Sequence, residues 1–176
     1  MSEHSDFYQL YIEHSKMVYN LCLNYLQNTE DAEEATQDVF IKVHEKIAGF
    51  RADASLKTWI YRITITHCFD IIKAKNRQKR FGFMQSLFGK YGKEEIPQKN
   101  FNHPGVELEN KEAIQKLLEL IQELPNNQKT ALILKSMDGL PGKEIAQIMQ
   151  LTEKALESLL SRAKQNLKLK IDQTKD

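Results

Sequence analysis

The segment from Phe50 to Arg80 places the single tryptophan, a helical apolar repeat and a dense run of cations on one continuous stretch. Its apolar positions recur every three or four residues, as on the buried face of a long helix. These positions are Leu56, Trp59, Ile60, Ile63, His67 and Ile71. Asp53 or Ser55 can cap the helix start, because either side chain can accept a hydrogen bond from a free backbone N–H. We therefore expect one side of a long helix to pack inward.

The opposite face of this helix is expected to point to solvent. It carries Lys57, Thr58, Tyr61, Arg62 and Thr66, followed by Lys73, Lys75, Arg77, Lys79 and Arg80. Aromatic groups beside cations are what a protein needs to stack on unpaired bases while it neutralises phosphates. The alternative is a core tryptophan followed by a solvated helix end, where cations also complement the helix dipole. The segment alone leaves both interpretations open.

Two helices are expected before this segment, the first from about Asp6 and the second from about Asp31 to Gly49. Together the three predict a compact helical domain over residues 1–80. The net charge of the chain is only +1, but its charges are segregated: residues 30–38 hold five acids and no base, and residues 73–80 hold five bases and no acid. This pattern suits a protein that touches nucleic acid with one surface and a basic protein with another, although an acidic helix face is usually just solvated.

Residues 81–105 interrupt the helical periodicity with repeated glycines and prolines, so we predict a linker there. It holds too many aromatic and aliphatic side chains for an inert tether, and either folds back on a domain or lies in a groove of a partner. Residues 106–176 are predicted to form a second helical domain. The predicted fold class is therefore all-α, with two small domains joined by an irregular linker.

The second domain ends in two helices with the spacing of a helix-turn-helix. A short helix over residues 143–149 is followed by Thr152, which can cap a long last helix. The small side chain of Ala146 lets the two helices approach closely. From Thr152 to Lys170 the last helix carries five cations against two acids, and such a helix can enter a major groove. A plain helical hairpin in a four-helix bundle is the alternative interpretation.

Several classes of function are not expected. Cys22 and Cys68 lie in apolar-periodic segments and are expected to be buried thiols. His67 and Cys68 point about 100° apart on a helix and lack a C-x-x-C or H-x₃-H partner, so we expect no metal site. We find no P-loop and no nucleophile with a base at recognisable spacing, so we expect no catalytic residues, cofactor or small-molecule substrate. Without a membrane span or signal peptide, the predicted location is cytoplasmic.

The order of these features resembles an extracytoplasmic-function (ECF) sigma factor, one of the small two-domain members of the sigma-70 family. Asp31 to Phe40 resembles the polymerase-binding segment, and Phe50-Arg51 with Ser55 to Ile63 resembles the promoter-melting segment. The segments that resemble the promoter-reading helix-turn-helix are Leu124-Pro125, Gly139-Leu140, Glu144 to Ala146, and Ser158 with Arg162 to Lys164. The resemblance covers nearly the whole chain.

The resemblance implies a dissociable subunit of bacterial RNA polymerase that directs promoter recognition, DNA melting and initiation. The implied polymerase-binding residues are Asp31, Glu34, Gln37, Asp38 and Phe40. The implied minus-ten residues are Phe50, Arg51, Ser55, Lys57, Trp59, Arg62, Thr66, Lys73 and Arg77. The implied minus-thirty-five residues are Thr152, Lys154, Glu157, Ser158, Arg162 and Lys164. The implied partners are the core polymerase, promoter DNA as duplex and as melted strand, and an anti-sigma factor.

The chain departs from the family pattern at a few positions. Ala52 stands where the family often has glycine, so a stiffer loop is expected, and Thr66 stands where related proteins often have asparagine, which leaves the preferred flipped base open. Glu157 and Leu159 stand where the family usually has basic residues, so we expect weaker or altered minus-thirty-five reading. The competing hypothesis is a stand-alone helix-turn-helix regulator that binds duplex DNA without polymerase.

Overall fold

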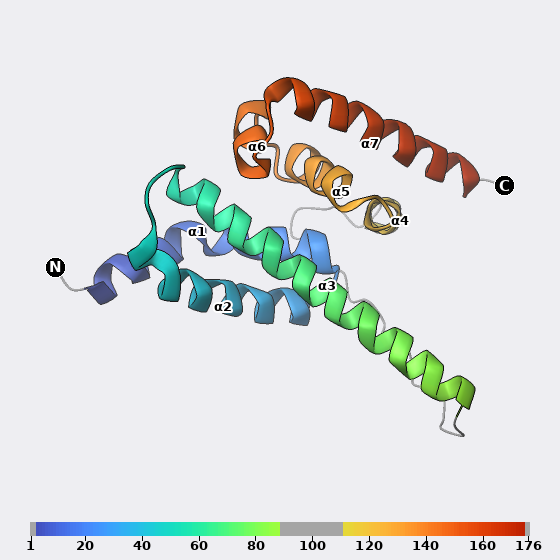
Figure 1. Ribbon diagram of the computed structural model, residues 1–176, viewed down its shortest axis with the longest axis horizontal. Coiled ribbons are helices and arrows are strands. Elements are labelled where there is room, and N and C mark those ends of the chain that lie inside the picture. Colours follow the sequence, from blue (N-terminus) through green and yellow to red (C-terminus); the bar gives the residue numbers. More distant parts are fainter. Residues whose placement is uncertain (1–2, 89–110, 175–176) are drawn as a thin grey trace.

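The computed structural model describes residues 3–88 and 111–174, and the regular elements within these ranges are helices (Figure 1). The N-terminal unit consists of α1 (Glu3–Leu26), α2 (Thr29–Lys46) and α3 (Leu56–Phe88), with a 3-10 turn at Ile47–Gly49. The C-terminal unit consists of α4 (Lys111–Gln122), α5 (Asn126–Leu132), a π-helical turn at Ile133–Met137, α6 (Gly142–Met149) and α7 (Glu153–Gln173). The described ranges thus agree with the predicted all-α class.

The N-terminal unit is a three-helix bundle in which each helix contacts the other two. Its core contains Val18, Leu21, Cys22, Tyr25, Ala32, Ala35, Val39, Val43, Ile60 and Cys68. Asn28 caps α2, because its side-chain oxygen accepts a hydrogen bond from Asp31 N at 2.9 Å. Ser55 is the residue that caps α3, since its Oγ accepts a hydrogen bond from Thr58 N at 3.1 Å. The free thiols of Cys22 and Cys68 are buried with their sulfurs 3.8 Å apart.

The C-terminal unit is built around the corner between α6 and α7. Its core contains Leu118, Ile121, Leu124, Ile133, Leu134, Ile145, Ala146, Leu156 and Ala163. Gln150 caps the end of α6 in the left-handed conformation at φ 56°, and α7 begins three residues later. Thr152 caps α7 as expected, because its Oγ1 accepts a hydrogen bond from Ala155 N at 3.2 Å. The predicted helix-turn-helix is therefore present, with the small Ala146 side chain buried at the corner.

Two expectations about α3 were wrong. The helix does not end near residue 80 but continues to Phe88, so the first part of the predicted linker is helical; residues 89–110 lie outside the described ranges. Thr58 and Tyr61, expected on a solvent face, are 4% and 3% exposed. The reason is a second packing partner, because the C-terminal unit lies along α3 and α6 contacts it directly (Figure 1).

Candidate nucleic-acid interface

The acidic face of α2 remains partly open to a partner. Glu34 and Gln37 are exposed, while Asp31 and Asp38 are half-buried. Phe40 was expected at the binding surface, but its side chain is 4% exposed and packs edge-on against the ring of Tyr11, 4.8 Å away. Phe40 therefore supports α2 from the core, and the open part of this surface is polar.

The half-buried acids of α2 are held by α3. Asp31 is paired with Lys75 from the basic tail. Asp38 Oδ2 lies 3.2 Å from His67 Nε2, and Lys42 Nζ lies 2.5 Å from His67 Nδ1. Burial and the neighbouring Lys42 ammonium lower the pKa of His67, and the carboxylate of Asp38 only partly opposes that shift. These contacts fix the acidic face of α2 relative to α3.

The loop before α3 presents an aromatic pair and an ion pair. The rings of Phe50 and Trp59 lie 5.2 Å apart at a 45° angle, and both side chains are partly exposed. Arg51 pairs with Asp53 at 3.5 Å, with both side chains largely in solvent. Ala52 between them adopts φ 57°, a left-handed conformation that glycine reaches more easily than alanine. The loop and the start of α3 thus share a partly exposed aromatic pair, and the loop backbone is held in a strained turn.

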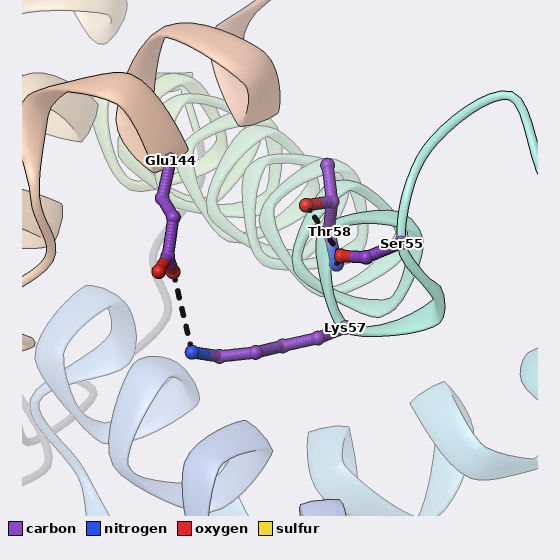
Figure 2. A network of polar contacts seen from close by, with 4 residues as sticks. All are labelled: Ser55, Lys57, Thr58 and Glu144. Atoms are coloured by element: carbon purple, nitrogen blue, oxygen red, sulfur yellow. Dashed lines mark hydrogen bonds and ion pairs between the residues drawn. The ribbon is translucent and has the colours of Figure 1, made fainter.

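The first cations of α3 point toward the C-terminal unit. Lys57 Nζ lies 3.3 Å from Glu144 Oε2 on α6 (Figure 2). The Arg62 guanidinium donates hydrogen bonds to two backbone carbonyls at the end of α6: Nη2 to Gln147 O at 2.6 Å and Nε to Ile148 O at 3.2 Å. A helix C-terminus carries partial negative charge on its unpaired carbonyls, so α6 offers Arg62 the kind of oxygen ligand that a phosphate offers.

The rest of the predicted minus-ten surface is exposed. Thr66, Lys73 and Arg77 all face solvent, and no ion pair is recorded for Lys73 or Arg77 within the described ranges. The Thr66 hydroxyl donates a hydrogen bond to Arg62 O at 2.8 Å, so its hydrogen is already used within the helix. The aromatic pair, Thr66 and the basic tail lie along the helix in the order that a single nucleic-acid strand could follow.

All the predicted minus-thirty-five side chains are exposed on one long helix, α7. They are Lys154, Glu157, Ser158, Arg162 and Lys164, with Thr152 at the cap. Arg162 Nε donates a hydrogen bond to Ser158 O at 3.3 Å within the helix, which leaves the other guanidinium N–H groups available. Leu159 is half-buried and packs against the core, so it is a packing residue.

A polar cluster between the two units was not predicted from the sequence. Asn24 Nδ2 donates a hydrogen bond to Asp138 Oδ1 at 3.3 Å, and the Tyr61 hydroxyl is the other hydrogen-bond partner of this carboxylate. Burial raises the pKa of Asp138 to about 6, which these hydrogen bonds and Lys57 oppose only partly. Each residue looked ordinary in sequence, since Asp138 precedes a glycine turn and Asn24 lies within a helix. Nothing in the sequence indicates that these residues contact one another in the fold.

The contact continues along α1, α3 and α5. Tyr25 donates a hydrogen bond to Thr130 Oγ1 at 2.7 Å in a buried position, and burial raises the pKa of the Tyr25 hydroxyl. The Lys129 ammonium lies 6.0 Å from the ring centroid of Phe69, within reach of a cation–π contact. Gln122 Nε2 donates a hydrogen bond to Asn24 O at 3.2 Å. The two units therefore share an extended boundary that includes several polar contacts.

Within the described part of the chain, no group of three or more His, Cys, Asp or Glu side chains is arranged to hold a metal ion. None of the helices described there is long and apolar enough to cross a membrane. The arrangement instead offers an acidic surface on α2, an aromatic and basic surface on α3, and a mostly basic surface on α7.

The chain matches two models of one protein family. Residues 10–78 match Sigma-70 region 2, and residues 114–167 match Sigma-70, region 4. Together they cover more than half of the chain, and they correspond to the N-terminal and C-terminal units. The predicted resemblance to the sigma-70 family is confirmed.

Curated relatives and solved structures agree with this match. The RNA polymerase sigma-H factor of Pseudomonas aeruginosa is 24% identical over 89% of this chain and 81% of that protein. The ECF RNA polymerase sigma-E factor of Escherichia coli K12 is 25% identical over 92% of this chain and 84% of that protein. CnrH in complex with the cytosolic domain of CnrY shares the fold with a TM-score of 0.67 at 16% identity, over 97% of this chain and 90% of CnrH. RpoE of Bartonella quintana in complex with the anti-sigma factor NepR gives 0.59 at 21% identity, over 95% of this chain and 98% of RpoE.

Proposed function

Because the chain belongs to the sigma-70 family, we propose that it is a sigma factor of the ECF group, a dissociable subunit that directs RNA polymerase to promoters. The observation that carries this proposal is the presence, on one chain, of an aromatic and basic surface on α3, which suits a single strand, and a mostly basic exposed face on α7, which suits duplex. A protein that only binds duplex needs the second surface but not the first. Initiation needs both, because the promoter is first read as duplex and then melted.

Each surface has a separate role in this proposal. Glu34, Gln37 and the outer edges of Asp31 and Asp38 dock on a basic surface of the core polymerase, where charge complementarity gives register and a fast encounter. Phe50 and Trp59 stack on bases of the opened minus-ten element, at about 1–3 kcal/mol per base. Arg51, Lys73 and Arg77 neutralise phosphates of the strand.

The helix α7 reads the minus-thirty-five element in the major groove. Lys154, Ser158, Arg162 and Lys164 contact phosphates and base edges there, and Thr152 holds the start of the helix. Glu157 on the same face accepts a hydrogen bond from a cytosine amino group or repels phosphate, which alters the preferred sequence. Because α3 continues to Phe88, the proposed domain limits are 1–88 and 106–176, with a shorter linker between them.

An anti-sigma protein is proposed as a further partner. Two solved structures with this fold, CnrH and RpoE, are complexes with CnrY and with the anti-sigma factor NepR. A partner that covers α2 and α7 would block both polymerase docking and duplex reading. We place the protein in the cytoplasm with the polymerase and assign it no catalytic activity of its own.

The experiment that tests this function is run-off transcription with purified bacterial core polymerase on a pool of promoter fragments. We expect specific initiation only when core and this protein are both present. The matched control is the double variant Gln37→Ala with Asp38→Arg, which alters the docking surface and should abolish initiation, with circular dichroism to confirm that it folds. Binding to duplex without core, together with no initiation, would instead establish the stand-alone regulator.

A further inference from the structure

The far part of α3 differs from the near part in that it has no buried face. As far as Ile72, every turn of the helix has buried or half-buried side chains. From Lys75 to Phe81 every side chain is exposed, and Figure 1 shows α3 running on beyond α1 and α2. Packing of an apolar face supplies most of the stability of a helix in a protein. This segment therefore lacks the usual reason for being a helix.

The exposed segment also carries cations without partners. Lys73, Arg77 and Arg80 recur at spacings of three and four residues, so they share one side of the helix. Neither they nor Lys79 take part in an ion pair with another described side chain, and no acid follows Asp70 in α3. Like charges at this spacing repel one another and destabilise a helix. A bound polyanion would remove this repulsion.

The helix dipole does not account for these cations. Cations are favoured in the last turn of a helix, where the carbonyl groups are unpaired, and the effect falls off within that turn. α3 ends at Phe88, and its last turn contains no base. Arg80 lies about two turns before that end. The cations are therefore placed for a partner outside the helix.

Phe81 is the second unusual feature of this segment. Its side chain is 64% exposed, and it lies one turn beyond Arg77 on the same side of the helix, next to Arg80. Stacking on an unpaired base would remove its apolar surface from water while the neighbouring cations bind phosphates. The match to Sigma-70 region 2 ends at residue 78, so it does not reach Phe81.

We propose that Arg77, Arg80 and Phe81 form a second strand contact at the far end of α3, in which Phe81 stacks on an unpaired base and the two guanidinium groups bind the flanking phosphates. The inference rests on the proposed function, in which the pair of Phe50 and Trp59 is the first strand contact. Phe81 follows Trp59 by 22 residues, which is about 33 Å along a helix. A stacked strand rises about 3.4 Å per nucleotide, so about ten nucleotides span both contacts.

The second contact adds affinity and not base choice. Every base has a face on which an aromatic ring can stack, and a phosphate contact is the same for every sequence. Phe81 therefore holds the separated strand over a greater length of α3 and opposes its return to the duplex. The choice of sequence stays with the other surfaces.

Binding to a strand without promoter sequence tests the stacking. The probe is a fluorescent oligothymidine of about 20 nucleotides, longer than the proposed span, titrated at low salt with the full chain in the absence of polymerase. Phe81→Ala should weaken binding about five- to tenfold, and Phe81→Tyr, which keeps a stacking ring, should bind as the original chain does. The matched control is Tyr8→Ala, because Tyr8 on α1 is also 64% exposed. It should bind normally.

Three results of this titration would overturn the proposal. They are an unchanged affinity of Phe81→Ala, an equal loss for Tyr8→Ala, and no binding by the original chain at low salt. A duplex of the same length is the further control, since its bases offer no open face along the helix. Phe81→Ala should bind that duplex as the original chain does. An equal loss on duplex and on strand would also contradict stacking.

Salt dependence tests the phosphate contact separately. Arg80→Gln should reduce the slope of log affinity against log salt on oligothymidine by about 0.7, the value for one phosphate of a single strand. Phe81→Ala should keep the slope, because it removes no charge. Lys16→Gln, an equal charge change at an exposed position on α1, is the control and should also keep it. An unchanged slope for Arg80→Gln would overturn the phosphate contact.

These assays contain neither polymerase nor promoter sequence. A failed run-off assay with the original chain would refute the sigma-factor function and leave strand binding by Phe81 measurable. Conversely, normal initiation by the original chain, together with unchanged binding of oligothymidine by Phe81→Ala, would refute the second strand contact alone.

Discussion

The two helices assigned to DNA binding, α3 and α7, differ in whether other parts of the chain contact their cations. On α3, Lys57 and Arg62 are bound by oxygens of α6. On α7, the cations Lys154, Arg162 and Lys164 face solvent. The difference leaves the cations of α7 open to a partner, whereas those at the start of α3 already have oxygen ligands within the chain.

The packing of the two helices explains the difference. α3 is buried on two sides, by Ile60 and Cys68 toward its own bundle and by Tyr61 toward the C-terminal unit. In α7, the fully buried side chains are Leu156 and Ala163, which face the core of the C-terminal unit. A helix with one buried stripe leaves a wide face for DNA, and a helix with two buried stripes does not.

The largest expected effect is a loss of stability confined to the C-terminal unit. Leu156, 1% exposed, closes the α6–α7 corner, so Leu156→Ala should cost about 2–5 kcal/mol of stability. Hydrogen exchange should show lost protection in α5 to α7 and retained protection in the buried parts of α1 to α3. Equal loss in both units would show one cooperative structure, and the comparison between separate units would be wrong.

The next effect concerns Asp138 and depends on pH. Burial raises the pKa of Asp138 to about 6 from an ordinary 3.8. Between these two pH values the folded chain therefore binds more protons than the unfolded chain. Its stability therefore falls as pH rises through this range and is lowest above about pH 6. Asp138→Asn removes the buried charge and should stabilise the chain by on the order of 2 kcal/mol near pH 7.5.

Urea unfolding at two pH values checks this expectation. The gain in stability from Asp138→Asn should shrink clearly near pH 5, where Asp138 of the original folded chain is already mostly protonated. An equal gain at about pH 5 and about pH 7.5 would show that the carboxylate charge is not the cause. A loss of stability at both would mean that the hydrogen bonds from Asn24 and Tyr61 outweigh the cost of burial.

A smaller effect is expected for duplex binding by the exposed face of α7. Glu157 is exposed on the same helix as the cations, so Glu157→Arg should strengthen binding to upstream promoter duplex by about tenfold and steepen its salt dependence by about one phosphate contact. Fluorescence anisotropy over a series of salt concentrations measures both. Asp172→Arg, an equal charge change near the end of α7, is the control. An unchanged salt slope for Glu157→Arg would remove this face from the interface.

The smallest effects come from the two helix caps. Ser55→Ala removes the cap of α3 and Thr152→Ala that of α7, each at about 1 kcal/mol of stability. Their consequences should separate: the first should weaken binding to single-stranded minus-ten DNA and spare duplex binding, and the second should do the reverse. Fluorescence anisotropy with a single-stranded minus-ten DNA and with upstream promoter duplex measures both. Equal losses on both probes would contradict separate surfaces.

Local features were predictable from the sequence, and contacts between distant segments were not. The cap at Thr152, the helix-turn-helix corner at Ala146 and the acidic run of α2 follow from rules that act over a few residues. The burial of Tyr61 could not be predicted in this way, because the helical repeat shows that a side is apolar but does not show what covers a polar side. Phe40 was misplaced for a related reason, since its aromatic partner Tyr11 belongs to another helix.

The central claim is that this chain directs promoter melting as a polymerase subunit, and permanganate footprinting of a promoter selected by run-off transcription tests it most directly. Unpaired thymines near the start site should become reactive only when core polymerase and this protein are both present. The variant Trp59→Ala should leave upstream duplex protection in place and reduce thymine reactivity, because the stacking surface with Phe50 is lost. Upstream protection by the protein alone, with no reactive thymines after core is added, would contradict the account and identify a duplex-binding regulator.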